Sequence, residues 1–358
     1  MRKLSVFLLS IFFLSASRAS SYNAVLVADI DSGKIIYSEN ADDLNYPASL
    51  TKIMTLYLAF NALEQGRLRL DQNLIVSKTA ANARPVKIGL PAGSKITVEN
   101  AIKAVAVYSA NDMAIVLSEN LTGDEGDFAS MMTRVASEIG LKNTNFSNAS
   151  GLSDDEHIST AKDMALLAIA VKKHYPQYWH FFSVPYFNYN GKSFRNGNGL
   201  LGSYEGCDGM KTGFTNRSRY SLIATARQNE KHLVSVVLGA DGKTDRNAVS
   251  RALLDYGFGK INKFKVQSAS VPKYEKPTEY RAEKYPTGDG SSGVQFGAFG
   301  TEHAAKLQQD KVYALFGLTT YLEKYNGMLR VRAKMSESEA KKIKGQCTSR
   351  GVDCYVFH

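Results

Sequence analysis

The apolar and polar positions at the start of the chain predict a strand hairpin followed by a helix. Residues 23–29 ("NAVLVAD") and 34–38 ("KIIYS") flank the turn "DSG" and are rich in strand-forming residues. Residues 45–63 are largely apolar, with Pro47 near the first turn and Gly66 beyond the end. Proline in the first turn and glycine after the last turn are typical helix boundaries.

Helical patterns dominate the middle of the chain, from Val98 to about Lys173. Gly140 is expected to end one of these helices. Thr160 and Asp163 predict a capping box at the start of "KDMALLAIAVKK". The Gly- and Asn-rich stretch "NGKSFRNGNGLL" that follows predicts a loop.

Strand patterns return after Met210. The segments "RYSLIATARQ" and "HLVSVVLGAD" flank the turn "NEK", and a final helix is expected over about residues 245–256. Strands at both ends with helices between them predict an α+β domain whose ends meet in one antiparallel sheet. We expect this domain to span residues 20–265.

The composition changes after Lys265. Residues 266–291 are rich in Pro, Gly, Ser and charge, which is typical of a linker. Within residues 292–358, "GVQFGAF", "MLRVRAK" and "DCYVFH" predict strands, and "EHAAKLQQDKV" and "SEAKKIKGQC" predict helices. This β-α-β-α-β order fits a small split sheet with helices on one face. Because the segment is too short for a large core, we expect a binding module.

The first residues have the pattern of a secretory signal peptide, which we place at residues 1–19. Arg2 and Lys3 precede an apolar run over residues 4–14 and then small residues. The run is too short to span a membrane well, and no other window comes close, so we expect an exported chain without a transmembrane segment after cleavage.

Composition excludes some classes of function. The chain is 44% hydrophobic and 22% charged, as globular proteins are, and loss of Arg2, Lys3 and Arg18 lowers its formal charge from +10 to +7. This moderate basic excess suits an anionic wall polymer or a membrane surface. The sequence contains no basic stripe interleaved with aromatic residues, so it does not indicate a nucleic-acid partner.

The stretch "PASLTKIMTLYLAF" contains a single full charge, Lys52, three residues after Ser49. Residues i and i+3 of a helix share a face, so the two side chains are neighbours. Burial lowers the pKa of a lysine, and a neutral amine can take the proton that a serine must lose to become a nucleophile. On this spacing alone, the simpler interpretation is favoured, in which the ammonium of Lys52 extends to solvent.

The same Ser-x-x-Lys spacing recurs at Ser159, Ser270 and Ser338. Ser159 precedes a helix cap, Ser270 has a proline inside the motif, and Ser338 lies in the charged stretch "SESEAKK". Only Ser49 lies in an apolar helix where the lysine requires an explanation.

Two further motifs accompany Ser49. "YSAND" places Ser109 and Asn111 about sixty residues later, and "GCDGMKTGFT" places Lys211-Thr212-Gly213 about a hundred residues beyond. The set Ser-x-x-Lys, Ser-x-Asn and Lys-Thr-Gly is that of serine β-lactamases and penicillin-binding proteins. Each motif alone is weak evidence, whereas the three in this order and spacing are strong evidence.

Residues 24–258 resemble the D-alanyl-D-alanine carboxypeptidases, the low-molecular-mass penicillin-binding proteins of the peptidase S11 type. "YPASLTKIMT", "VYSANDMA", "FSNASGLSDDEHISTAKDMALLA", "NGNGLLGSYEGCDGMKTGFT" and "LLDYGF" carry the likeness. The resemblance implies the fold of β-lactamases and penicillin-binding proteins, an antiparallel sheet flanked by helices. It also implies hydrolysis of the terminal D-Ala-D-Ala bond of peptidoglycan stem peptides, covalent inhibition by β-lactams, and no metal or cofactor.

The resemblance also implies roles for the motif residues. Ser49 is the nucleophile, Lys52 the base and Ser109 a proton relay, while Asn111 offers its amide to a substrate peptide bond. Lys211 supplies positive charge and Thr212 helps to hold the substrate carboxylate. Gly213 leaves room for substrate along the strand, and the backbone N–H groups of Ser49 and Phe214 form an oxyanion hole.

The tail, residues 292–358, resembles a SPOR domain through "VQFGAF", "AAKLQQ" and "GVDCYVF". Such domains are associated with glycan strands that lack stem peptides. Both resemblances place the protein in the periplasm of a Gram-negative bacterium or on its wall. Cys347 and Cys354 are within reach of a disulfide in an oxidising compartment, the alternative being two half-buried thiols; Cys207 is then single, and no cysteine has zinc-site spacing.

Some residues depart from the family pattern or lie outside the motifs. Arg217 and Arg219 stand where the family usually has small residues and a glycine, and Arg219 would narrow or charge the cleft rim. We interpret His157 as structural, since this mechanism needs no histidine. Cys207 is interpreted as a packing residue.

Three alternatives remain open from the sequence. A DD-endopeptidase uses the same residues on cross-linked peptides. A β-lactamase needs a residue that speeds deacylation, usually a glutamate, and Glu156 is no clear candidate for one. A non-enzymatic wall-binding protein would leave the front domain as a scaffold, but all of its motif residues are intact.

Overall fold

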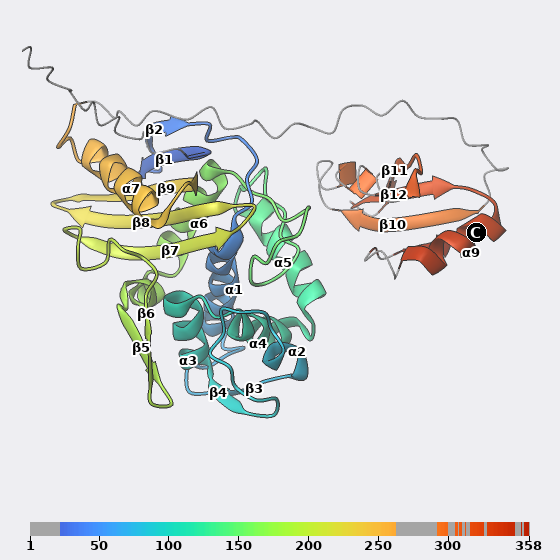
Figure 1. Cartoon of the computed structure of the whole chain (residues 1–358), viewed down its shortest axis with the longest axis horizontal. Helices are drawn as coiled ribbons and strands as arrows, with labels where there is room; N and C mark the ends of the chain where they lie inside the picture. Colours follow the sequence, from blue (N-terminus) through green and yellow to red (C-terminus); the bar gives the residue numbers. More distant parts are fainter. Residues whose placement is uncertain are drawn as a thin grey trace, which may run out of the picture.

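The computed structural model describes residues 22–262 and, with short gaps, residues 292–357. The predicted signal peptide and the predicted linker 266–291 lie outside the described residues. The front domain, residues 22–262, is built on a five-stranded sheet of order β2-β1-β9-β8-β7 (Figure 1). Its strands are β1 Ala24–Asp29, β2 Ile35–Glu39, β7 Cys207–Thr215, β8 Arg219–Gln228 and β9 Lys231–Ala240.

The first strand of this sheet pairs with one of the last. β1 is antiparallel to both β2 and β9, with Val25 opposite Val237. The predicted meeting of the two ends of the domain in one antiparallel sheet is therefore confirmed. β1 and β9 have apolar residues at successive positions because both of their faces are covered.

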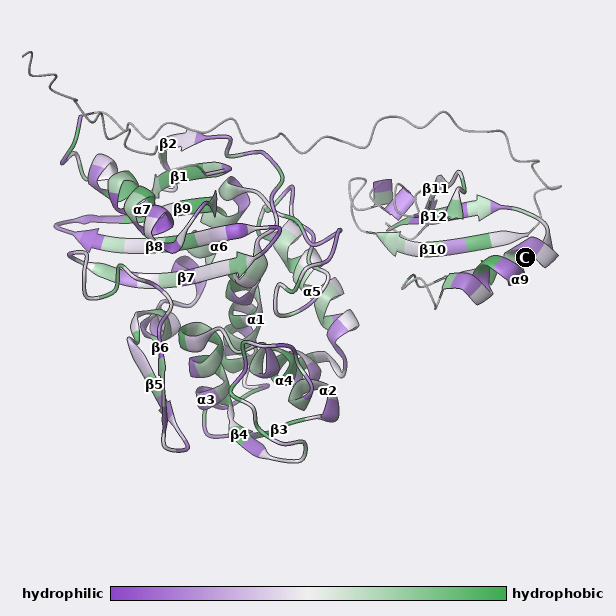
Figure 2. Cartoon of the chain, in the orientation of Figure 1, coloured by the Kyte–Doolittle hydropathy of each residue, from purple (hydrophilic) through white to green (hydrophobic). Residues whose placement is uncertain are grey.

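Two apolar clusters cover the two faces of the sheet. The smaller cluster packs the α7 side, and the larger one joins the sheet to the other helices. In Figure 2, β1 and β9 are coloured largely as hydrophobic. The helical segments of this domain are η1 Ala48–Thr51, α1 Lys52–Glu64, α2 Lys78–Ala81, α3 Val98–Lys103, η2 Ala104–Tyr108, α4 Asn111–Thr122, α5 Glu125–Glu138, α6 Ala161–His174, η3 Pro176–Ser183 and α7 Lys243–Gly257.

The structure confirms the predicted helix end at Gly140 and the predicted helix start at Thr160. Gly140, which follows the C-cap residue Ile139 of α5, has a left-handed φ of +95°. The Thr160 hydroxyl accepts a hydrogen bond from Asp163 N at the start of α6. The Asp163 carboxylate accepts from Asn143 N and from the Thr144 hydroxyl, so it ties the preceding loop to the helix.

The prediction of a loop over "NGKSFRNGNGLL" is wrong in its first part. β5 Tyr186–Tyr189 and β6 Lys192–Arg195 form a hairpin there. Asn190 and Gly191 make its two-residue turn with φ of +48° and +73°, the backbone that an Asn-Gly turn favours. A second short hairpin joins β3 Asn73–Ile75 to β4 Lys95–Thr97.

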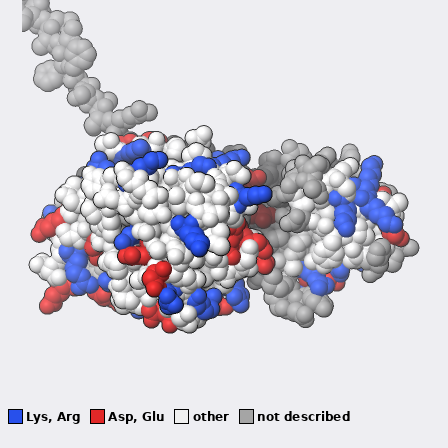
Figure 3. Space-filling model, turned by 90° about the horizontal axis from the view of Figure 1, so that it is seen from below, with Lys and Arg blue, Asp and Glu red and all other residues white. Residues whose placement is uncertain are grey.

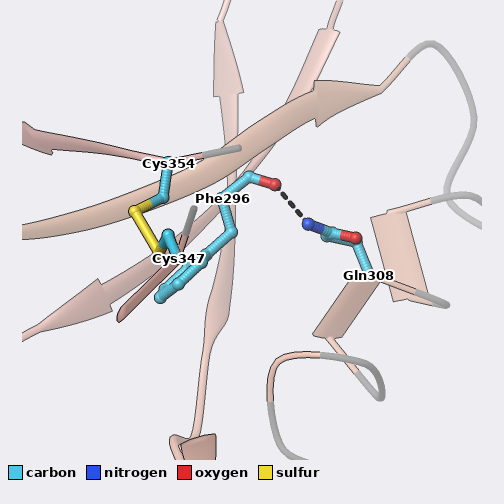
Figure 4. The surroundings of a disulfide bond; sticks show 4 residues. All are labelled: Phe296, Gln308, Cys347 and Cys354. Carbon is cyan, nitrogen blue, oxygen red and sulfur yellow. Dashed lines mark hydrogen bonds between the residues drawn. A yellow bond between two sulfur atoms is a disulfide. The ribbon is translucent and has the colours of Figure 1, made fainter. Parts of the chain in front are cut away.

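The C-terminal module is a four-stranded antiparallel sheet of order β11-β12-β10-β13. The predicted strands correspond to β10 Gly293–Phe299, β12 Met328–Lys334 and β13 Tyr355–Phe357, and α9 spans Glu337–Cys347. The prediction omitted β11, Tyr321–Tyr325, whose alternating polar residues pair with β12. Cys347 and Cys354 form a disulfide that ties α9 to the segment before β13 (Figure 4).

Candidate active site

Ser49 lies in a tight turn. Residues 48–51 form the short 3-10 segment η1, and the α-helix begins only at Lys52, so the prediction of one continuous helix over residues 45–63 is wrong at its start. Ala48 has a φ of +49°, which is unusual for a residue with a side chain. This turn leaves Ser49 partly exposed at the head of a buried helix.

Lys52 is fully buried directly behind Ser49. Its Nζ lies 3.1 Å from Ser49 Oγ, 2.7 Å from Asn111 Oδ1 and 2.5 Å from the Ser150 carbonyl oxygen. The carbonyl oxygens of Asn111 and Ser150 can only accept hydrogen bonds. Of the three partners, only the Ser49 hydroxyl can give a proton to the amine.

Electrostatics favour the neutral form of this amine. Burial lowers the pKa of Lys52 well below 10.5, and the nearby charge of Lys211 lowers it further. Glu125 and Asp112 oppose the shift. A neutral Lys52 would donate to Asn111 and Ser150 and accept from Ser49, which suits all three contacts.

Ser109 lies between η2 and α4, with a left-handed φ of +68°. Its Oγ is buried and has no hydrogen-bond partner within the described part of the chain. An unpaired buried hydroxyl is costly unless a ligand or water completes it.

Asn111, at the start of α4, is already engaged in the protein. Its carbonyl faces Lys52, and its Nδ2 donates to Arg84 O at 3.0 Å. One amide hydrogen therefore remains for a substrate. The first task of this side chain in the structure is to orient Lys52.

The loop of residues 147–157 completes the surroundings of Lys52, and sequence reasoning missed its part. Asn148 Oδ1 accepts from the backbone N–H groups of Ser150, Gly151 and Leu152. The φ of Gly151 is +79°, and a Cβ there would lie 1.8 Å from Ala48 O. Only glycine fits this contact, which sets the Ser150 carbonyl against Lys52.

His157 fastens the same loop to α1. Its Nδ1 accepts from Ser147 N at 3.2 Å, so its Nε2 carries the proton and donates to the Thr51 hydroxyl at 2.6 Å. Burial lowers the pKa of His157 to about 4, with a smaller effect of Lys52 in the same direction. The histidine is thus a neutral structural link, as interpreted from the sequence.

The Lys-Thr-Gly motif lies on β7, the edge strand beside η1. A Cβ at Gly213 would lie 2.9 Å from Pro47 O, so the glycine allows β7 to approach the turn that holds Ser49. Lys211 is 2% exposed, and burial, followed by the charge of Arg246, lowers its pKa to about 7. The Nζ of Lys211 donates to Thr212 O.

Arg246 is a second buried cation, which the sequence analysis did not single out. It donates to Gly197 O at 3.3 Å. A Cβ at Gly197 would lie 2.7 Å from Thr212 Oγ1, so the Thr212 hydroxyl packs against the same glycine. Within residues 22–262, no ion pair joins Arg246 or Lys211 to a carboxylate. Two buried cations beside a hydroxyl form a place for an anionic group.

The family model described as D-alanyl-D-alanine carboxypeptidase, peptidase S11, matches residues 13–242, more than half of the chain. The chain belongs to this carboxypeptidase family. It is 36% identical over 242 residues to the D-alanyl-D-alanine carboxypeptidase DacF of Bacillus subtilis. The aligned region covers 66% of this chain and 61% of DacF. The chain spans less than two thirds of the length of the curated relatives that it matches first.

Solved structures of penicillin-binding proteins share the fold of the family domain. Penicillin binding protein 5 of Haemophilus influenzae is 32% identical, with a TM-score of 0.65 over 68% of this chain and 72% of that one. Penicillin-Binding Protein D2 of Listeria monocytogenes in its ampicillin-bound form is 32% identical, with a TM-score of 0.60 over 66% and 97%. The expected fold of the front domain is therefore confirmed.

The two arginines that depart from the carboxypeptidase pattern both have partners. Arg219 pairs with Asp241 and donates to Asn23 Oδ1, at the β1 side of β8. Arg217 pairs with Asp155, and its Nη2 donates to the Tyr46 hydroxyl at 2.6 Å. The expectation that Arg219 charges the cleft rim finds no support here, since Asp241 compensates its charge.

Two more residues named from the sequence have the following surroundings. The Phe214 ring is exposed and stacks on Tyr220 with centroids 4.4 Å apart. Cys207 is half-buried, and burial raises the pKa of its thiol to about 11, which fits a packing role.

Among the described residues, no helix is long and apolar enough to cross a membrane. No cluster of His, Cys, Asp and Glu in this part of the chain has the arrangement of a metal site. On the face that Figure 3 shows, basic and acidic side chains are interspersed.

Proposed function

We propose that this chain is a serine-type carboxypeptidase that removes the terminal D-alanine from peptidoglycan stem peptides through an acyl-enzyme on Ser49. The observation that carries the proposal is the buried Lys52 amine, with two obligate acceptors and one hydroxyl around it. That arrangement activates a serine without histidine or metal.

The proposed reaction begins with transfer of the Ser49 proton to the neutral Lys52 amine. The Ser49 oxygen then attacks the carbonyl of the penultimate D-alanine, while the N–H groups of Ser49 and Phe214 stabilise the oxyanion. Lys52 returns its proton through the Ser109 hydroxyl to the departing amine. The Ser109 Oγ is suited to this relay because no group among the described residues competes for it. Water then hydrolyses the ester.

The terminal carboxylate of the substrate has a matching place. Thr212 Oγ1 and the Arg246 guanidinium flank Gly197, and Lys211 lies buried beside them. A carboxylate there would balance the charge of Arg246 and Lys211, which have no acidic partner within residues 22–262. We therefore add Arg246 to the proposed substrate-binding residues Lys211, Thr212 and Gly213.

β-Lactams mimic the terminal dipeptide, and we propose that they acylate Ser49 and leave slowly. The two carboxylates that act on Lys52 both hold backbone segments: Glu125 accepts from Ala149 N, and Asp112 accepts from the N–H groups of Ile88 and Gly89. We therefore assign both of them a structural role and not that of a base for deacylation. Cleavage of cross-linked peptides by the same residues is the second candidate.

For the C-terminal module we propose a SPOR-type role in binding glycan strands. Val294 and Phe296 pack toward the core, so Gln295 between them faces the other side of the sheet. Gln295 is 3% exposed, and its Oε1 has no partner among the residues that the structure describes. It lies opposite Arg332, whose guanidinium stacks on the Phe357 ring at 3.8 Å. Buried polar atoms beside aromatic rings suit a sugar ligand.

This assignment, with the signal peptide predicted from residues 1–19, supports an exported protein of the Gram-negative periplasm. The disulfide between Cys347 and Cys354 is in keeping with an oxidising compartment.

Labelling with a fluorescent penicillin tests the enzymatic proposal. Wild-type protein should be labelled, whereas Ser49→Ala, Lys52→Ala and Lys52→Arg should not, since none of the variants holds both a hydroxyl and a neutral amine. A labelled Lys52→Arg would refute the base role, and an unlabelled wild type would favour a scaffold. Mass analysis of digested muropeptides separates loss of D-alanine from cleavage of cross-links, and rapid turnover of nitrocefin would indicate a β-lactamase.

Deletion of residues 292–358 tests the glycan proposal. The shortened protein should still be labelled by penicillin but should sediment less with purified peptidoglycan. Unchanged sedimentation would refute the binding role of the module.

A further inference from the structure

Arg217 connects three parts of the chain that meet at the active site. It follows β7, pairs with Asp155 of the loop that carries Ser150, and donates to the hydroxyl of Tyr46. Its guanidinium carbon also lies 4.3 Å from the centre of the Tyr46 ring. Tyr46 comes three residues before Ser49, so the guanidinium lies beside the turn that holds the nucleophile.

The order of groups along β7 gives the direction of a bound substrate, if the proposed function is correct. Thr212, with Arg246 nearby, marks the end that takes the terminal carboxylate. Gly213 abuts the turn that carries Ser49, where the attacked carbonyl must lie. The acyl side of the substrate therefore continues past Thr215 toward Arg217, because an extended peptide advances about 3.3 Å per residue beside a strand.

The substrate residue one step from the attacked D-alanine on the acyl side would lie toward this guanidinium, and a carboxylate on its side chain would complement the positive charge of Arg217. We propose that Arg217 selects stem peptides whose residue at this position carries a carboxylate, an inference that rests on the proposed function. Arginine suits this task because its planar group can bind a carboxylate through two parallel N–H bonds.

One existing contact of Arg217 can be exchanged for such a ligand. The guanidinium is bonded to the Asp155 carboxylate, which a substrate carboxylate resembles, and to the Tyr46 hydroxyl. The side chain of Arg217 is 46% exposed and that of Asp155 is 72% exposed, so their ion pair lies in water and contributes little stability. A substrate carboxylate can replace Asp155 on the guanidinium, while the Tyr46 ring holds the guanidinium in place.

Arg219 offers a matched control in the same turn. It carries the same charge two residues away, but it reaches Asp241 and Asn23 near β1. A general effect of positive charge near β7 would involve both arginines. Direct recognition would involve Arg217 alone.

The test measures kcat/KM for release of D-alanine from two pentapeptides that end in X-D-Ala-D-Ala, where X is diaminopimelate or lysine. The two peptides differ at X by a single carboxylate. We expect full-length wild-type protein to prefer the diaminopimelate peptide about tenfold, as one charged hydrogen-bonded contact allows. Arg217→Gln should lower this preference to about one, chiefly through the diaminopimelate peptide, and Arg219→Gln should leave it unchanged.

The ratio of the two peptides separates recognition from support. If Arg217 only braces the loop, Arg217→Gln slows both peptides equally and the ratio persists, which overturns the proposal. If wild-type protein cleaves the two peptides with nearly equal kcat/KM, the proposal is overturned without any variant. The proposal can therefore be refuted even if Arg217→Gln does not fold. Higher salt should also reduce the wild-type preference, since exposed charges are screened.

The outcomes also distinguish this inference from the proposed function. Cleavage of both peptides at equal rates refutes the role of Arg217 but remains consistent with the proposed carboxypeptidase function. Failure to release D-alanine from either peptide, by protein that penicillin still labels, refutes the carboxypeptidase and this inference with it.

Discussion

The buried neutral His157 makes the folding stability of the front domain depend on pH between about pH 6.5 and pH 4. The pKa of this histidine is about 4 in the folded protein and about 6.5 in an unfolded chain. Between these values the unfolded chain takes up a proton that the folded domain does not. The contribution of His157 to the free energy of unfolding is therefore fully present above the unfolded pKa and is lost as the pH falls toward 4. From pH 7 to pH 4 the expected loss is about 3 kcal/mol from this residue alone.

Urea unfolding at pH 7 and pH 4, followed by the fluorescence of Trp179, measures this loss. Trp179 is the single tryptophan of the chain and is buried in this domain, so the C-terminal module does not contribute to the signal. Because carboxylates also titrate in this range, the informative quantity is the difference between wild type and His157→Gln.

Glutamine at 157 retains a donor for the Thr51 hydroxyl but cannot take up a proton. The variant should be less stable at pH 7, because Ser147 N loses its acceptor, and should lose about 3 kcal/mol less than wild type between pH 7 and pH 4. Parallel losses in the two proteins would refute the reasoning that His157 is held neutral by burial.

Three further predictions concern packing, electrostatics and the disulfide. Gly151→Ala should cost roughly 3 kcal/mol or more of folding free energy, read from urea unfolding, since its Cβ would meet a carbonyl of η1 at 1.8 Å; a normal stability would contradict that contact. Glu125→Gln keeps an acceptor but removes a charge that raises the pKa of Lys52, so the acid limb of penicillin acylation should move to lower pH, and a shift to higher pH would be inconsistent. Replacing Cys347 and Cys354 by serine should destabilise the C-terminal module by about 2.5 kcal/mol, measured by hydrogen exchange, and an unchanged exchange rate would argue against the bond.

Much of the fold could be predicted from the sequence, because long periodic segments specify their elements. The strands at both ends of the front domain and the final helix follow directly from the apolar pattern. The Asn190-Gly191 turn was also readable, since Asn-Gly between alternating residues favours a hairpin, but the Gly- and Asn-rich context suggested a loop. The strand β11 was missed because its residues are mostly polar.

The motif residues of the site were found because each carries a distinctive side chain. Their supports were missed because several act through the backbone, such as the Ser150 carbonyl on Lys52 and the close approach of Gly151 to Ala48. No spacing rule in a single sequence predicts that a loop about 100 residues away supplies a carbonyl to the base.

Arg246 is a different case, because a signal was present. It shares the buried stripe of α7 with Val249, Leu253 and Leu254 at helical spacing. A charge within an apolar stripe is the argument that had drawn attention to Lys52, and it applied equally here.

The most direct test of the central claim is the pH dependence of Ser49 acylation by benzylpenicillin, measured as a second-order rate constant by intact-protein mass. If Lys52 acts as a neutral base, the rate should level off well below pH 10.5, because burial and the charge of Lys211 lower its pKa. A rate that continues to rise tenfold per pH unit up to pH 10 would show an ordinary lysine and contradict the account.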